Sequence, residues 1–130
     1  ESLHQMAQNL VWISNEWMLR PRIEAASQRA GWEFSGVPKL SALLQTDFQT
    51  ASDRLLVLID LPSALQISSE LLTQLRETFG SLSIVAFGPH VQEAALQEAL
   101  DIGCDAVWTN GQLQHQINSG SFPELASLES

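Results

Sequence analysis

The sequence lacks the features of redox, zinc-binding and membrane-spanning proteins. Its single cysteine, Cys104, can form no internal disulfide and supplies no zinc cluster. Because Cys104 precedes an apolar strand, we expect it to be a buried structural thiol. No apolar run approaches the ~20 residues that a membrane helix needs. The opening ESLHQMAQNL has neither the basic region nor the apolar stretch of a signal peptide, which predicts a cytoplasmic location.

Basic residues are also scarce. Six lysines and arginines face fifteen aspartates and glutamates, for a net charge of −9. A field of that sign repels phosphate backbones and anionic lipids, so we expect no binding to nucleic acid or membranes. The sequence contains no GxSxG, P-loop or GxGxxG motif, and one cysteine with scattered histidines is no evidence for a nucleophile. We therefore expect no enzymatic activity.

What the sequence does contain is a regular alternation of apolar strands and helical periods. We predict one domain over residues 9–118, a leader over 1–8 and a flexible tail over 119–130. The predicted strands are 9–14, 32–35, 55–60, 83–87 and 105–108. The predicted helices are 20–31, 39–45, 64–79, 91–103 and 111–118, with a polar loop at 46–53.

This alternation predicts an α/β fold of three layers, a doubly wound, flavodoxin-like five-stranded parallel sheet of order 2-1-3-4-5. The strands that contain LVWI, LLVLI and SIVAF are continuously apolar, which is typical of central strands covered on both faces. The weaker strands WEFS and DAVW then lie at the edges. We expect Leu56, Leu58, Ile84 and Val85 to be buried.

Ligands of such a sheet bind at the carboxyl ends of its strands. The residues that follow the strands there are Asn15, Glu16, Asp60, Gly88, Pro89, His90, Thr109 and Asn110. Strands 1 and 3 are neighbours in the predicted order, so Glu16 and Asp60 should face a common rim. Two carboxylates at such a rim are enough for a weak Mg²⁺ or Ca²⁺ site. The alternative for Asp60 is a strand-end carboxylate that bonds to nearby backbone N–H groups.

From about Asn9 to Ile117 the sequence resembles the receiver domain of two-component response regulators. In that family an acidic pair after strand 1 and an aspartate that ends strand 3 hold Mg²⁺, and this aspartate accepts a phosphoryl group. A Thr or Ser after strand 4 and a Lys after strand 5 bind the phosphoryl oxygens. The resemblance implies that Asp60 is the phosphoacceptor equivalent and that Glu16 is the second acid of the pair.

The departures from the receiver pattern fall on the residues of the chemistry. Asn15 replaces the first acid, Gly88 replaces the hydroxyl residue, and Asn110 stands where the lysine belongs. After Asp60 the family's Met-Pro turn is replaced by LPSA, so that Pro62 arrives early. The resemblance is therefore to a degenerate pseudo-receiver. We expect Mg²⁺ to bind weakly or not at all, no other cofactor, and no stable phosphoryl adduct on Asp60.

Our leading hypothesis is a non-catalytic signalling module that contacts other proteins, with a weak homodimer left open. We expect its output face on helix 91–103, strand 105–108 and helix 111–118. Polar residues there favour transient contacts: Gln92, Glu93, Gln97, Thr109 and Gln112. One alternative is an active variant receiver that is phosphorylated on Asp60 in a phosphorelay. Another is a flavodoxin-like small-ligand binder that uses Glu16, Asp60 and His90.

Two smaller expectations concern the rim. We expect His90 to be a surface residue that begins a helix, with a pH-sensitive group beside Asp60 as the alternative. We expect Trp12 and Trp108 to be sheet residues. For Trp17 we expect ordinary packing, with docking of a partner as the alternative.

Overall fold

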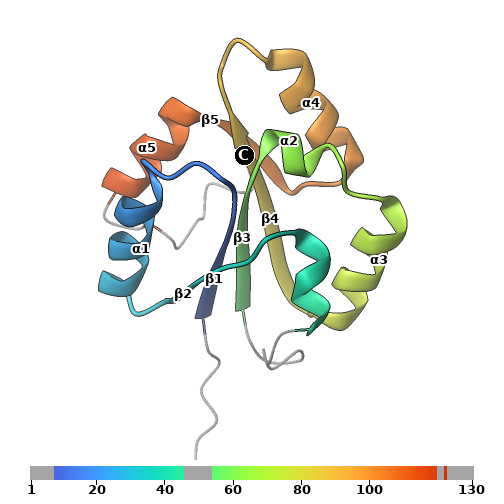
Figure 1. Ribbon diagram of the computed structural model, residues 1–130, viewed down its shortest axis with the longest axis horizontal. Helices are drawn as coiled ribbons and strands as arrows, with labels where there is room; N and C mark the ends of the chain where they lie inside the picture. Colours follow the sequence, from blue (N-terminus) through green and yellow to red (C-terminus); the bar gives the residue numbers. More distant parts are fainter. Residues whose placement is uncertain (1–7, 46–53, 120–121, 123–130) are drawn as a thin grey trace, which may run out of the picture.

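The computed structural model describes residues 8–45, 54–119 and 122. They form one five-stranded parallel sheet of order β2-β1-β3-β4-β5 with helices on both faces (Figure 1). The strands are β1 (Gln8–Ile13), β2 (Glu33–Gly36), β3 (Arg54–Asp60), β4 (Ser81–Gly88) and β5 (Ala106–Thr109). The helices are α1 (Arg20–Arg29), the 3₁₀ helix η1 (Leu40–Gln45), α2 (Leu61–Ala64), α3 (Ser69–Thr78), α4 (Glu93–Ile102) and α5 (Asn110–Asn118). The predicted fold class and strand order are confirmed.

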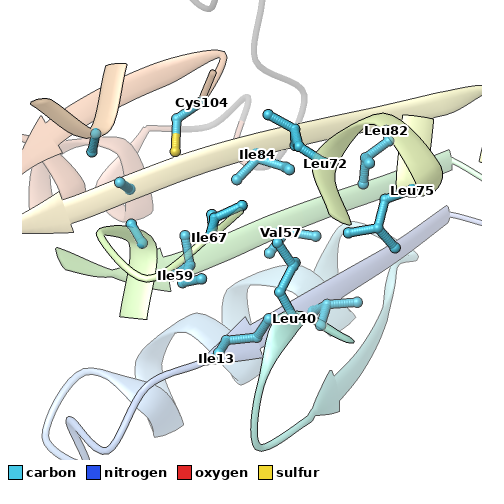
Figure 2. Packing of buried hydrophobic residues seen from close by; sticks show 14 of the residues in the cluster. Ile13, Leu40, Val57, Ile59, Ile67, Leu72, Leu75, Leu82, Ile84 and Cys104 are labelled. Atoms are coloured by element: carbon cyan, nitrogen blue, oxygen red, sulfur yellow. The ribbon is translucent and has the colours of Figure 1, made fainter. Parts of the chain in front are cut away.

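Side chains that alternate along the central strands build two cores, one on each face of the sheet. Ile13, Val57 and Ile84 face η1, α2, α3 and α4, and we call this the α3-side core (Figure 2). Trp12, Leu58 and Val85 face α1 and α5, and we call this the α1-side core. Trp12 stacks on Phe87 there, with ring centroids 5.1 Å apart. The four residues that we expected to be buried are at most 3% exposed.

The helix predicted over residues 64–79 is wrong in its first part: α2 ends at Ala64, residues 65–68 are not helical, and α3 begins only at Ser69. α2 begins directly after Asp60, whose carboxylate accepts a hydrogen bond from the backbone N–H of Ser63. α3 begins after Ser68, whose hydroxyl accepts from the N–H of Leu71. The Asp60 cap satisfies a donor of the first turn of α2, and the Ser68 cap satisfies the N–H of Leu71, which a continuous helix would pair internally. The Ser68 cap therefore favours a new helix start at Ser69.

Other boundaries differ by less. The helix predicted from residue 91 begins at Glu93, so His90 lies in the preceding turn and begins no helix. The helix predicted over 39–45 is the 3₁₀ helix η1. Gln8, which we predicted as the end of the leader, is the first residue of β1.

A hydrogen-bonded cluster around Arg76 joins α3 to β4 and to the turn before β5. The Arg76 guanidinium donates to the carbonyl oxygens of Leu82 (3.3 Å) and Gly103 (2.9 Å) and to the Asp105 carboxylate (3.1 Å). That same carboxylate accepts from the backbone N–H of Ile84 at 2.7 Å. One charged pair therefore holds α3 and the neighbouring β4 to the turn before β5, which lies 27 to 29 positions after Arg76.

Cys104 is buried in the α3-side core beside this cluster, as predicted (Figure 2). Burial, and next the charge of Asp105, raise the pKa of its thiol to about 11, although Arg76 acts in the opposite direction. A thiol with so high a pKa is almost entirely protonated at neutral pH, which is typical of a structural cysteine.

The predicted leader, the polar loop at 46–53 and most of the predicted tail lie outside the described residues. Phe122 of that tail is described, and its side chain is buried in the α1-side core. Within the described ranges, none of the helices has the length and apolar character needed to cross a membrane.

Candidate functional site

Parallel pairing brings the carboxyl ends of the strands to one edge of the sheet, where the predicted site lies. Ile13 of β1 pairs with Ile59 of β3, and Asp60 pairs with Phe87 of β4. Gly88 in turn pairs with Thr109 of β5. The residues that we predicted for the rim therefore follow four neighbouring strand ends: Asn15, Glu16, Asp60, Gly88, Pro89, His90, Thr109 and Asn110.

Glu16 holds the loop between β1 and α1 in place. Its Oε1 accepts from the backbone N–H of Leu19 at 2.7 Å, and its Oε2 accepts from that of Met18 at 3.1 Å. The backbone N–H of Glu16 itself donates to the Ser14 hydroxyl at 2.9 Å. Both carboxylate oxygens are thus engaged within their own loop. They also cap the entry to α1, since the residue before that helix, Leu19, has no side-chain acceptor.

Asp60 is half-buried at the mouth of β3, and its Oδ1 accepts from the N–H of Ser63 at 3.0 Å. This is the geometry of a helix N-cap, which stabilises the negative charge by a backbone donor and by the dipole of the short α2. Asp60 therefore has the local structural role that we gave as the alternative to phosphorylation.

Gly88 is packed against a leucine at the position where the receiver resemblance expects a hydroxyl side chain. A Cβ at Gly88 would lie 3.1 Å from both Cβ and Cδ2 of Leu61. Leu61 is only 1% exposed, so its side chain is enclosed by the protein and cannot turn out into solvent. A Ser or Thr at this position would need Leu61 to shift. Leu61 was not among the residues predicted for the rim, although a glycine at a strand end is itself a sign of close approach.

Thr109 and Asn110 begin α5 with a reciprocal cap. The Thr109 hydroxyl accepts from the N–H of Gln112 at 3.0 Å, while the Gln112 side-chain oxygen accepts from the N–H of Thr109 at 2.8 Å. Asn110 is the first residue of the helix. The Thr109 oxygen is therefore committed to the helix start, and Asn110 contributes no charge.

The loops at the rim expose apolar side chains. Trp17 is 75% exposed and Met18 66%, in the loop that Glu16 holds, and Val91 is 76% exposed in the turn after β4. The prediction that Trp17 packs in the ordinary way is wrong, whereas Trp12 and Trp108 are buried sheet residues as predicted. His90 and Pro89 are exposed in the same turn as Val91.

Positive charge and metal ligands are both scarce at this edge. The chain has a single lysine, Lys39, which lines a groove between η1 and α2, and none of its five arginines directly follows β3, β4 or β5. Among the residues that the structure describes, no group of three or more His, Cys, Asp or Glu side chains is placed to hold a metal ion. The grooves along α1 and α5, between η1 and α2, and on α3 do not include Glu16, Asp60 or His90.

No family model and no curated protein matches the chain by sequence. Its structure, however, is similar to those of solved receivers. The receiver domain of the TMAO respiratory response regulator TorR is 20% identical with a TM-score of 0.62, over 85% of this chain and 90% of that one. The phosphorylated cyanobacterial phytochrome response regulator RcpA is 16% identical with a TM-score of 0.64, over 95% and 96%.

A third similar structure is the chemotaxis response regulator CheY4 of Vibrio cholerae, which is 15% identical with a TM-score of 0.57, over 85% of this chain and 98% of that one. At these identities the likeness concerns the fold. The receiver-like fold that the sequence predicted is confirmed, over nearly the whole length of each receiver.

Proposed function

We propose that this chain is a non-enzymatic signalling module that uses a receiver-like fold to contact other proteins, without phosphoryl transfer to Asp60. The observation that carries this proposal is the packing of Leu61 against Gly88. The receiver resemblance expects at position 88 a hydroxyl that binds a phosphoryl oxygen. In this chain the apolar side chain of Leu61 fills that place.

Three further features support the same function. Asn15 removes one carboxylate from the acidic pair, and both oxygens of Glu16 already accept hydrogen bonds from the loop that follows it. A hard cation such as Mg²⁺ needs several oxygen ligands, so this set is poor. Asn110 brings a dipole but no positive charge to the end of β5.

The charge balance argues against a stable adduct. A phosphoryl group on Asp60 would bring roughly two negative charges to a rim that already has Glu16. In an active receiver a cation and a lysine offset that charge. The loss of one preorganised donor typically costs ~3 to 4 kcal/mol of transition-state stabilisation, so losing two slows transfer greatly.

The test is incubation with Mg²⁺ and acetyl phosphate, followed by mass spectrometry of the intact protein. We expect no added phosphate mass, while an active receiver treated in parallel gains it. The matched control is Asp60→Asn. An added phosphate mass that is absent from the Asn variant would replace this proposal with the second candidate, a variant receiver phosphorylated on Asp60. The half-buried aspartate at the end of β3 is the feature that favours that candidate.

The face that we propose for output is formed by α4, β5 and α5. Gln92, Glu93, Gln97 and Gln112 are exposed there, and the Gln97 amide donates to the Asp101 carboxylate at 3.0 Å. This polar surface suits transient partners, including a weak homodimer, better than obligate ones. A cytoplasmic location and the absence of nucleic-acid and membrane binding remain predictions from composition.

A further inference from the structure

A groove of about 540 Å³ runs between α1 and α5, on the opposite side of the sheet from α3 and α4 (Figure 1). Arg22, Ala25 and Arg29 line one wall, and Ile117 contributes an apolar part of the other. The groove does not include the rim at the strand ends; it shares α5 with the proposed output face, but none of the exposed polar residues named for that face lines it.

The two arginines of this groove lie on one stripe of α1. Residues 22, 25 and 29 are three, four and seven positions apart, which places them on the same side of a helix. At ~1.5 Å per residue, Arg22 and Arg29 are roughly 10 Å apart along the axis, or two helical turns. Within the described part of the chain, neither guanidinium forms an ion pair; the ion pair that is described joins Arg76 and Asp105. The groove therefore presents two unpaired charges with the methyl group of Ala25 between them.

Arg22 is at an unfavourable place for the helix itself. It lies in the first turn of α1, where the helix dipole disfavours cations, and that turn has no acidic residue. Arg20 lies in the same turn, but its guanidinium is over the ring of Phe34, 5.4 Å from the centroid. Among the residues that the structure describes, Arg22 lies over no aromatic ring that would offset its cost. A residue that breaks a local rule without an internal compensation is a candidate for a role in binding.

The electrostatics near the groove differ from those of the whole chain. α1 has three arginines and one glutamate, Glu24, and α5 has no acidic residue. Exposed carboxylates that lie farther from the groove than the Debye length, ~8 Å at physiological ionic strength, act on it only weakly. A negatively charged ligand is thus attracted locally, despite the net charge of −9.

We propose that the α1–α5 groove binds an acidic helix of a partner protein. Two carboxylates of that helix, two turns apart, pair with Arg22 and Arg29, and the small apolar residues between them lie over Ala25 and Ile117. A groove flanked by two helices suits the helix-in-groove mode of recognition. The proposal rests on the function as a protein-interaction module, but not on the chemistry of Asp60.

A partner protein explains the groove better than a second copy of this chain. A second copy brings a net charge of −9 of its own, and its acidic helix α4 would dock head to tail. Such a head-to-tail contact forms rings or open filaments, and not the two-fold dimer that is commonest among homo-oligomers. The acidic helix is therefore assigned to a different protein.

The probe for this test is a synthetic, fluorescently labelled peptide of roughly 18 residues, long enough to form a helix. It is alanine-rich with two glutamates seven positions apart. In the control peptide the glutamates are five positions apart, which turns them roughly 140° away from each other on the helix. Fluorescence anisotropy with the full chain measures both dissociation constants. We expect binding of the first peptide that weakens with salt, and much weaker binding of the second.

Variants of the groove locate the binding. We expect Arg22→Ala and Arg29→Ala each to weaken the peptide roughly three- to tenfold, and the double variant more, as for partly desolvated charge pairs. Lys39→Ala removes one positive charge outside this groove and is the matched control. Its affinity should stay within about twofold of the wild type, because screening confines charge effects to the groove. Thermal unfolding checks the fold, and Arg22→Ala should melt no lower than the wild type since it removes a cation from a helix start.

Several results would overturn the proposal. Equal binding of the two peptides would mean that charge alone, without the spacing, attracts the peptide. Wild-type affinity in the double variant would mean that the peptide binds elsewhere on the chain. A dimer in analytical ultracentrifugation that dissociates in the double variant would assign the groove to a second copy. Tighter peptide binding after removal of residues 123–130 would assign it to the chain's own end. A phosphate adduct on Asp60 would refute the proposed function and leave peptide binding unaffected, so the two failures are distinguishable.

Discussion

The substitution Gly88→Ala tests whether Leu61 fills the place of the receiver hydroxyl. The new Cβ would lie 3.1 Å from two carbon atoms of Leu61, whose side chain is almost fully buried. Overpacking of this kind typically costs about 1 to 3 kcal/mol. Replacement of a glycine within a strand by alanine returns about 0.5 to 1 kcal/mol of backbone entropy. We therefore expect Gly88→Ala to lower the free energy of unfolding by about 1 kcal/mol, within a range of roughly 0 to 2.5 kcal/mol.

Urea denaturation followed by tryptophan fluorescence measures this loss, because Trp12, Trp32 and Trp108 are buried. Gly80→Ala is the matched control: no atom lies within 4 Å of a Cβ built there, and Gly80 does not have a positive φ. We expect that control to be neutral or stabilising by about 0.4 to 1 kcal/mol.

A double-mutant cycle with Leu61→Ala links the loss to its cause. Leu61→Ala removes the contact of Cδ2 but keeps that of Cβ. In this background the cost of Gly88→Ala should fall without vanishing, which gives a coupling energy of about 0.5 kcal/mol or more. If Gly88→Ala is as stable as Gly80→Ala, or if the cycle shows no coupling, the structural argument for a lost hydroxyl site is refuted.

Two further predictions concern the metal and the thiol. Titration with Mg²⁺, followed by the fluorescence of the exposed Trp17, should show no saturation in the tens-of-micromolar range. The reason is that the Asn15 position lacks a carboxylate and that both oxygens of Glu16 accept hydrogen bonds within its loop. Saturation in that range that disappears in Glu16→Gln would contradict this prediction. Modification of Cys104 by a thiol reagent at pH 8 should be far slower in the folded protein than in urea, because burial raises the pKa of the thiol to about 11. With the folded pKa above the unfolded value of 9.0, the associated stability is complete below pH 9 and is lost as the pH rises towards 11. Equal modification rates, or a stability that is constant from pH 8 to about 11, would count against the buried thiol.

The fold could be predicted from the sequence because its central strands are apolar on both faces. Strands such as LLVLI pack only between two layers of helices, and short strands that alternate with helices form parallel sheets with right-handed crossovers. The same logic placed Glu16 and Asp60 at neighbouring strand ends. It could not reveal that both carboxylates cap their own loops, because loop geometry decides those bonds.

The break between α2 and α3 shows a second limit. Leu65, Leu72, Leu75 and Phe79 are seven, three and four positions apart, spacings that suit one continuous helix, and periodicity alone favours it. The outcome depends on Asp60 and Ser68, which offer side-chain oxygens to the backbone at two places.

The groove between α1 and α5 was missed for a different reason. Sequence pattern does not show which side chains of neighbouring helices line a groove. Arg22 and Arg29 were therefore not recognised as parts of one site.

The cluster around Arg76 has a consequence for strand alignment. The backbone N–H of Asp105 donates to the Ile84 carbonyl at 2.8 Å, and its carboxylate accepts from the Ile84 N–H at 2.7 Å. These two bonds form a rung one residue before β5, whose four residues pair with β4 from Val85 and Ala106 onward. A slip by one position would turn Trp108 out of the α1-side core to the other face. One aspartate thus fixes the alignment of a very short edge strand, so loss of its carboxylate should produce a mixture of alignments within an intact sheet.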